Sequence, residues 1–429
     1  MSTESQNKIN RRSLLKSIGT TMAMAAVSPS SSLQSEVAKP QTTSSQPLDD
    51  RVRELLKKSV FTKKEVDDLL MGNNNSTYIS RKYDPVLGYV FWNCRFAHGS
   101  DGSICTYTYE PSRQRTAGAR LMMTNADKPC RINTYGDSFT HGDQVNDGET
   151  WQERLAAHLG EPVRNFGVGN YSVYQAYLRM QQEEARKPAK YIIMQFHGDD
   201  HFRSLQPLIP GFGIRPYLRV DADAALCEEH TNPWPTPYSL YQLCDLDWLY
   251  ENFGDFVRIY LKKYSASGES PEKKSQVSKI FGKSLVQSDV KFYTSDNPTP
   301  ALVRDALFGT MHLVEKIEAF AASTGSKVLY VLTYGPIHMR ETLVSGHRFD
   351  QSLVDFLRKK NVPYVDLMDL HSKEFAMSKL SVDDYMRRYY VYKPGHYNPM
   401  ANVFMAFAIK EKILTLLNPK PPAYSKDEV

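Results

Sequence analysis

Short apolar segments alternate with amphipathic segments from Arg131 onward, and this alternation constrains the fold more than any other feature of the chain. Residues 131–135, 163–166 and 191–196 have the apolar character of buried strands, and segments with helical spacing separate them. A strand–helix–strand order favours a parallel sheet with helices on both faces. The sequence therefore predicts an α/β fold, a three-layer α/β/α sandwich around a parallel sheet.

The same alternation breaks and then resumes towards the C-terminus. Between residues 205 and 298, prolines, an aromatic run and a Lys/Ser-rich segment replace it, so we interpret this stretch as an insertion. The main domain is expected at 130–418, with 419–429 as a C-terminal tail. Its later elements are expected at 301–323 (helix), 327–332 (strand), 351–359 (helix), 364–367 (strand) and about 400–417 (helix), with a loop before the last helix.

The N-terminal part of the chain differs from the rest in composition. Residues 1–27 contain Arg11-Arg12, then a short apolar run and a small-residue cleavage site, which together are similar to a twin-arginine export signal. Residues 28–48 are rich in Ser, Thr and Gln and are expected to form a disordered linker. Residues 49–129 contain two short helical patterns and then apolar runs broken by Gly, Asn and Pro, which predict a β-rich preface.

Charge, cysteine content and hydropathy exclude several classes of function. The net charge of +5 is small for 429 residues and is spread along the chain, so nucleic-acid binding is not expected. The five cysteines include no Cys-x-x-Cys pair, so no zinc site or other cofactor is predicted. In an exported protein, Cys94–Cys105 and Cys227–Cys244 are the candidate disulfides nearest in sequence. After the leader, no apolar stretch is long enough for a permanent membrane span.

One serine lies where a nucleophile can project from the predicted sheet. Ser138 follows the strand at 131–135 directly, in a turn bracketed by Gly136 and Gly142. A serine is a useful nucleophile only when a base takes its proton and N–H donors hold the oxyanion. Open α/β sheets bind ligands at the carboxyl ends of their strands, so we expect three further segments to meet Ser138 there. These are the loops Gly167–Asn170 and Gly198–Asp200, and the loop 394–399, which presents His396 before the last helix.

Taken together, these segments resemble the SGNH (GDSL-type) hydrolase family. The resemblance covers roughly residues 84–204 and 300–417, and its most specific part is the sequence Tyr-Gly-Asp-Ser-Phe-Thr-His-Gly around Ser138. It implies an SGNH hydrolase-like, flavodoxin-like fold. It also implies a serine hydrolase in which Ser138 is the nucleophile and His396 is the general base.

The resemblance implies roles for the residues around this pair as well. The family's second block puts an oxyanion N–H at Asn170, with Gly169 beside it. The third block normally ends in Asn-Asp, and Asp199 stands where the Asn side chain would donate to the oxyanion. Asp199 would then be protonated, or another donor would complete the oxyanion hole, or this chain would depart from standard esterase chemistry. Asp137 and Asp200 are expected to support the site.

The sequence leaves the acid partner of His396 open. The family places an Asp shortly before this histidine, and no acid stands there in this chain. A backbone carbonyl, or one of the acids Asp366, Asp383 and Asp384, could orient the ring instead. A Ser–His pair without its third member is still a working arrangement with lower activity.

Other histidines also lie near the predicted strand ends. His141, His197 or His201 could be the functional histidine or a substrate contact. His197 and His201 form a cluster with Asp199 and Asp200 whose side chains are metal-ligand types. Their spacing matches no tight template, and no metal is predicted.

The leading hypothesis is an exported serine esterase of a bacterium, periplasmic or secreted, that cleaves a small-molecule or carbohydrate ester. The precursor would be a substrate of the twin-arginine export machinery. Two alternatives keep the same fold: an O-acyltransferase that modifies an envelope polysaccharide, and a non-catalytic binding protein on a degenerate hydrolase fold.

Overall fold

The computed structural model describes residues 48–72, 81–91, 94–97, 104–110, 119–209, 213–264, 298–391 and 395–425. The predicted export signal at 1–27, all but the last residue of the linker predicted at 28–48, and the Lys/Ser-rich part of the insertion lie outside these residues. The described residues belong to a single structural unit, residues 46–429.

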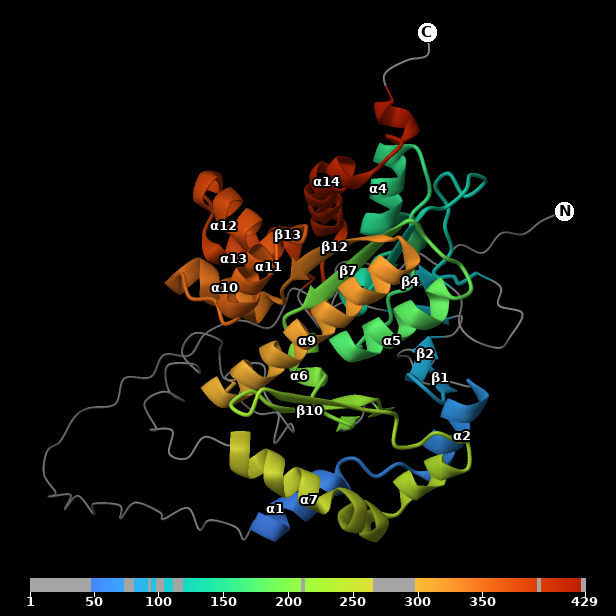
Figure 1. The fold of residues 1–429 in the computed structure, drawn as a ribbon, viewed down its shortest axis with the longest axis vertical. Coiled ribbons are helices and arrows are strands. Elements are labelled where there is room, and N and C mark those ends of the chain that lie inside the picture. The colour runs from blue at the N-terminus through green and yellow to red at the C-terminus, as the bar shows by residue number, and fades with distance from the viewer. Residues whose placement is uncertain are drawn as a thin grey trace, which may run out of the picture. The chain divides into compact units, whose positions relative to one another are not determined.

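Five parallel strands form the central sheet, in the order β13-β12-β7-β5-β6 (Figure 1). They are β5 (Ile132–Tyr135), β6 (Arg164–Asn165), β7 (Tyr191–His197), β12 (Lys327–Thr333) and β13 (Tyr364–Asp366). Every residue of β5 and β7 is buried, as expected for strands that helices cover on both faces. Numbered along the chain, the strands have the flavodoxin-like order 2-1-3-4-5. The predicted three-layer α/β/α fold is confirmed.

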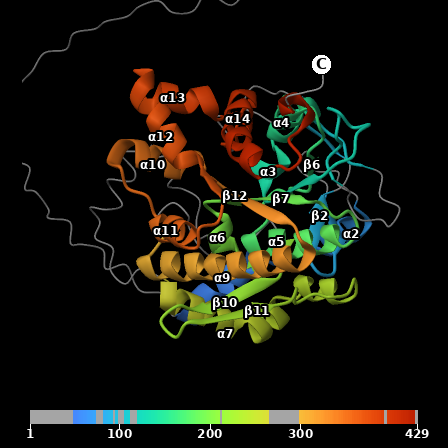
Figure 2. The same ribbon diagram turned by 45° about the horizontal axis from the view of Figure 1, so that its top comes forward.

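Helices cover both faces of this sheet. Helices α4 and α14 pack together on one face, and α5 and α9 pack together on the other (Figure 2). The helices that follow β5 in the chain include α3 (Ser138–His141), α4 (Trp151–Leu159), α5 (Val173–Glu184), α6 (Asp200–Arg203), α9 (Pro300–Thr324), α10 (Pro336–Ser345), α11 (Gln351–Lys359) and α14 (Pro399–Leu416). Ser or Thr side chains accept from backbone N–H groups at the starts of α4, α5 and α9, which fixes where these helices begin.

Most of the stretch between the last strand and the last helix is helical, so the prediction of a loop there holds only for the short segment around His396. It contains α12 (Leu367–Ser378) and α13 (Val382–Tyr389). Asp366 ends β13 and also caps α12, because its carboxylate accepts from the N–H groups of Met368 at 3.1 Å and Asp369 at 3.4 Å. One residue therefore closes a strand and opens a helix, which leaves no connecting loop.

A second hydrophobic core joins the N-terminal preface to the insertion. Helix α1 (Leu48–Lys57) lies beside α7 (Leu246–Tyr264), as Figure 1 shows. Val52 and Leu55 of α1 share this core with Leu249 and Val257 of α7, and Tyr171 from the loop after β6 enters it too. Two segments that are distant in the sequence therefore form the core into which that loop packs.

The remaining elements are short and surround this second core or the sheet. They are α2 (Lys63–Met71), β1 (Arg81–Asp84), β2 (Gly88–Phe91), β3 (Cys94–Ala97), β4 (Ile104–Tyr107), β8 (Leu208–Ile209), β9 (Gly213–Ile214), β10 (Tyr217–Asp221) and β11 (Leu226–His230), with 3₁₀ turns at Asp147–Glu149, Ser239–Cys244 and Pro422–Tyr424. The insertion thus contributes a hairpin, β10–β11, that packs on α9.

Two sequence expectations concern cysteines and membranes. Cys227 and Cys244, one of the two candidate disulfides, are both free thiols. The side chain of Cys94 lies outside the described residues, so its pairing with Cys105 stays untested. Within the described ranges, no helix combines the length and the apolar character needed to cross a bilayer.

Candidate active site

Ser138 lies in a tight turn at the carboxyl end of β5. Gly136 has a φ of +157°, and a Cβ there would collide with the side chains of Gln195 and Thr140, so only glycine fits. Asp137 then caps α3, because its carboxylate accepts from the N–H of Phe139 at 2.9 Å. The turn places Ser138 at the first position of α3, with the side chain 6% exposed.

His396 reaches this serine from the other end of the chain. Its Nε2 atom is 2.9 Å from Ser138 Oγ, which is hydrogen-bonding distance for a general base. The N–H of Val391 donates to the His396 carbonyl at 2.9 Å, and a bridge between Tyr390 and Tyr397 closes the loop below the ring. The structure therefore brings together the two residues that the sequence singled out as nucleophile and base.

Gln144 contacts the ring nitrogen of His396 that faces away from Ser138. Its Oε1 atom is 2.9 Å from His396 Nδ1, so the amide oxygen accepts from an Nδ1–H and leaves Nε2 to accept the serine proton. Gln144 is buried and has a φ of +69°, in the left-handed region that favours glycine. Its own N–H donates to Tyr107 Oη at 2.6 Å, which holds the turn.

The three acids suggested as partners of His396 lie elsewhere, so those suggestions are wrong. Asp366 pairs with Arg348 at 2.6 Å, Asp384 pairs with Arg387 at 2.8 Å, and Asp383 pairs with Arg340. The partners suggested from the sequence were carboxylates and a backbone carbonyl, so the neutral side-chain amide of Gln144 was missed. No sequence signal marks Gln144, apart from its position six residues after the nucleophile.

The loop after β6 lies beside the nucleophile turn. The N–H of Val168 donates to the Gly136 carbonyl at 3.1 Å, which ties the loop to the turn. Asn170 has a φ of +64°, and Asn is one of the few residues that adopt this conformation readily. Within the part of the chain that the structure describes, the backbone N–H groups of Ser138, Gly169 and Asn170 have no acceptor. These N–H groups are the candidate oxyanion donors.

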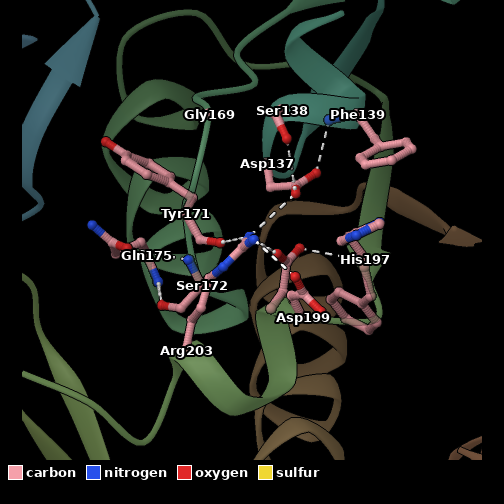
Figure 3. A network of polar contacts seen from close by, with 12 residues as sticks. Asp137, Ser138, Phe139, Gly169, Tyr171, Ser172, Gln175, His197, Asp199 and Arg203 are labelled. Atoms are coloured by element: carbon pink, nitrogen blue, oxygen red, sulfur yellow. Dashed lines mark hydrogen bonds and ion pairs between the residues drawn. The ribbon is translucent and has the colours of Figure 1, made fainter. Parts of the chain in front are cut away.

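Arg203 lies among three carboxylates beneath the serine (Figure 3). Its guanidinium is 2.7 Å from Asp200 Oδ1, 3.3 Å from Asp137 Oδ2 and 3.4 Å from Asp199 Oδ2. Asp137 Oδ2 in turn lies 3.3 Å from Ser138 Oγ, whose single hydrogen is directed to the nearer His396 Nε2. Burial raises the pKa of Asp200 well above its usual value, and the Asp137 charge raises it further.

This cluster surrounds Asp199, one of the oxyanion candidates from the sequence. The Asp199 side chain is 27% exposed and faces the Arg203 guanidinium, which offsets its negative charge. Asp137 and Asp200 share the same cation. Arg203 lies four residues after Asp199 on one helical turn, and this spacing is a signal that sequence reasoning could have used.

The other three candidate histidines are buried beside the site. His141 Nε2 is 2.7 Å from Tyr109 Oη, and its Nδ1 contacts Asp143. His197 stacks on Phe139 with ring centroids 4.0 Å apart. Burial lowers the pKa of His197 to about 4, and that of His201 likewise to about 4, so both rings are neutral near pH 7.

The four suggested metal ligands do not converge on one point. His197 and His201 bond to threonine hydroxyls, at 3.3 Å and 2.8 Å, while Asp199 and Asp200 face Arg203. Among the described residues, no group of three or more His, Cys, Asp or Glu is arranged to hold a metal ion.

A buried histidine anchors the loop that carries His396, and it leads to a prediction about stability. His371 contacts Tyr385 Oη at 2.9 Å and Tyr397 Oη at 3.1 Å, and burial lowers its pKa to about 3. In the unfolded chain this imidazole has a pKa of about 6.5 and takes up a proton as the pH falls below that value. In the folded chain it stays neutral until the pH nears 3. The stability that neutral His371 contributes is therefore present above pH 6.5 and is lost as the pH falls towards 3.

His371→Gln is expected to flatten the acid side of the stability profile. Between pH 7 and pH 5, His371 alone lowers the free energy of unfolding of the wild type by about 2 kcal/mol. Urea unfolding at the two pH values measures this difference, and His197 and His201 should maintain the remaining slope in the variant. Parallel profiles for the two proteins would contradict the assignment of a neutral buried His371.

Comparison with known proteins gives matches among solved structures alone. No family model matches the chain, and no curated protein matches it. A lipolytic protein of the G-D-S-L family from Desulfitobacterium hafniense is 10% identical, with a TM-score of 0.33 over 66% of this chain and 99% of that one. A G-D-S-L family member from Veillonella parvula is 13% identical, with a TM-score of 0.32 over 67% and 100%. An acetylxylan esterase from Geobacillus stearothermophilus is 9% identical, with a TM-score of 0.34 over 68% and 96%.

Proposed function

We propose that this protein is a serine esterase. The observation that carries the proposal is the hydrogen bond of 2.9 Å between Ser138 Oγ and His396 Nε2, with Gln144 holding the opposite ring nitrogen. Nucleophile and base within hydrogen-bond reach, with a third group orienting the base, is the signature of an activated serine. N–H groups on the adjacent loop can donate hydrogen bonds to the carbonyl oxygen of the ester as it becomes negatively charged.

The proposed reaction has two halves. Ser138 Oγ attacks the ester carbonyl carbon while its proton passes to His396 Nε2, and the carbonyl electrons move onto the oxygen beside the Ser138 and Asn170 N–H groups. His396 then returns the proton to the leaving alkoxide as the C–O bond breaks, which leaves an acyl group on Ser138. Water attacks this acyl-enzyme with His396 again as base, and the acid is released.

Covalent labelling together with turnover tests the proposal. The full chain should hydrolyse p-nitrophenyl acetate, and a fluorophosphonate should abolish this activity. Peptide mapping by mass spectrometry should place the label on Ser138 and leave the buried Ser204 unlabelled. Heat-unfolded protein is the control and should take up no label. Absence of both turnover and label would reject the function, and so would a label at another residue.

The finer proposal is that the ester is an acyl group on a carbohydrate. The aromatic share of 11%, with 26 tyrosines, and the export-like leader support it. Acetate release from an acetylated sugar, compared with p-nitrophenyl acetate at equal concentration, tests this step. If the aryl ester is cleaved and acetylated sugars are untouched, the carbohydrate part is rejected and the esterase part stands.

We also propose that the protein is exported by a twin-arginine route. Arg11-Arg12 and the apolar run after them support this proposal. Replacing both arginines by lysine is expected to trap the precursor in the cytoplasm, because export machinery of this kind reads the arginine pair. Fractionation of cells that express each form measures the outcome. Unchanged export of the Lys-Lys form would reject the route.

A further inference from the structure

Gln144 supplies orientation to His396 but no charge. Its Oε1 atom accepts from Nδ1 at 2.9 Å, which fixes the ring and its tautomer. When His396 takes the Ser138 proton, the ring becomes a cation, and an amide dipole offsets that charge far less than a carboxylate does. In a triad with an acid, one side chain both orients the histidine and stabilises the cation. The second role needs another residue here.

Asp143 places a carboxylate on the other side of the same ring. Its Oδ2 atom is 4.0 Å from His396 Nε2, the nitrogen that hydrogen-bonds to Ser138 Oγ. The Asp143 side chain is 3% exposed, so little water screens the interaction. The backbone holds it there, because the Asp143 N–H donates to the Ser138 carbonyl at 3.0 Å.

Neighbouring residues hold the Asp143 carboxylate in place. Its Oδ1 atom contacts His141 Nδ1, and the other nitrogen of that ring is 2.7 Å from Tyr109 Oη. Burial lowers the pKa of His141, so the ring is neutral and its Nδ1–H donates to Asp143. A Cβ at Gly169 would lie 2.9 Å from Asp143 Oδ2, so a larger residue there would collide with the carboxylate.

We infer that the two roles of a triad acid are divided between adjacent residues: Gln144 orients His396, and Asp143 supplies the negative charge that stabilises its cationic form. This inference rests on the proposed serine esterase function. In the attack step the Ser138 Oγ–H bond breaks, the proton forms a bond to His396 Nε2, and the Oγ–C bond forms as the carbonyl electrons move to oxygen. Asp143 takes no proton and acts on His396 through its charge alone.

Other groups near His396 and Asp143 stay constant in the experiment. Phe139 separates the His396 ring from His197, with centroids 5.5 Å and 4.0 Å away respectively. Among the described residues, Arg81, Tyr107 and His141 interact with Asp143, and Asp137 lies 3.3 Å from Ser138 Oγ. None of them is altered in the variants below.

Asp143→Asn is the first test. It keeps the shape of the side chain and removes its charge, so the cationic form of His396 becomes harder to reach. The acidic limb of the kcat/KM profile for p-nitrophenyl acetate is expected to move about one unit to lower pH, and kcat to fall about tenfold. A matched control is Asp147→Asn, which removes a buried carboxylate of the same loop that pairs with Arg120 at 2.9 Å. Its acidic limb should not move.

Moving the charge to the neighbour is the second test. Gln144→Glu puts a carboxylate on Nδ1, so the double variant Asp143→Asn/Gln144→Glu should recover the acidic limb of the wild type and most of its kcat. Failure to recover either one overturns the division of roles, and so does an unmoved limb in folded Asp143→Asn.

A third variant covers the case in which Asp143→Asn does not fold. Gln144→Met keeps Asp143 and its contact with His141 but removes the orienting oxygen. Its kcat should fall by about tenfold or more while its acidic limb moves by less than about half a unit. A limb shift of a full unit in Gln144→Met would overturn the inference. If instead the wild type shows neither turnover nor fluorophosphonate labelling, the esterase function itself is rejected.

Discussion

Ser138→Ala is expected to lower kcat for p-nitrophenyl acetate by at least about 10³-fold. In serine hydrolases, loss of the nucleophile leaves only the part of the rate enhancement that binding and the oxyanion donors provide. The substitution removes a single oxygen atom from a residue that is 6% exposed, so the fold should be unaffected. Circular dichroism and thermal unfolding should match those of the wild type, which separates loss of chemistry from loss of structure.

Ser372→Ala is the matched control for this experiment. Ser372 lies on α12, half-buried, where its hydroxyl donates to the Met368 carbonyl at 2.8 Å. It has no contact with the Ser138–His396 pair among the described residues, so turnover and fluorophosphonate labelling should be those of the wild type. Equal rates for Ser138→Ala and the wild type would show that hydrolysis occurs without this serine.

Arg203→Met is expected to have the largest effect on stability. The Arg203 side chain is 13% exposed and lies within 3.4 Å of carboxylates of Asp137, Asp199 and Asp200. Removing one partner of a buried charge cluster leaves the others unpaired and costs about 3–5 kcal/mol. Urea unfolding at pH 7 measures this loss. Activity should fall as well, because the unpaired charge of Asp137 lies 3.3 Å from the nucleophile oxygen.

Two further variants show whether the loss comes from unpaired charge. Arg358→Met removes an exposed arginine that pairs with Asp355, and exposed pairs of this kind contribute little, so its unfolding curve should overlie that of the wild type. Adding Asp200→Asn to Arg203→Met removes one of the unpaired carboxylates and should restore part of the lost stability. An Arg203→Met protein as stable as the wild type would rule out a structural role for the cluster.

The sheet was predictable because its strands are buried on both faces and are therefore almost continuously apolar. Residues 191–196 and 327–332 carry that signal plainly, and the structure extends each strand by one residue. The turn at Ser138 was predictable at the ligand-binding edge, because it follows a strand directly and a parallel sheet gathers the carboxyl ends of its strands there. The loop at His396 follows helix α13 and not a strand, so its place beside Ser138 was predicted from the resemblance to the hydrolase family alone.

Features that depend on tertiary contacts were not predictable. Gln144 orients His396 from a left-handed conformation that no residue pattern announces. The hairpin β10–β11 lies in a stretch where prolines and charged residues hide the alternation of a half-buried strand. Helices α12 and α13 do have capping residues, Asp366 and Ser381, but Asp366 also ends a strand, and that double role hid the helix start.

The order in which the chain emerges during synthesis sets when the site can work. Ser138 and His396 are 258 residues apart, and the second core joins Val52 to Leu261. When the turn at Ser138 has emerged from the ribosome, the nascent chain still lacks His396 and helix α7, which packs in the same core as the neighbouring loop. Hydrolytic activity would then arise only when nearly the whole polypeptide has left the ribosome, so turnover would report completed folding, and the exposed serine of a partial chain would be inert.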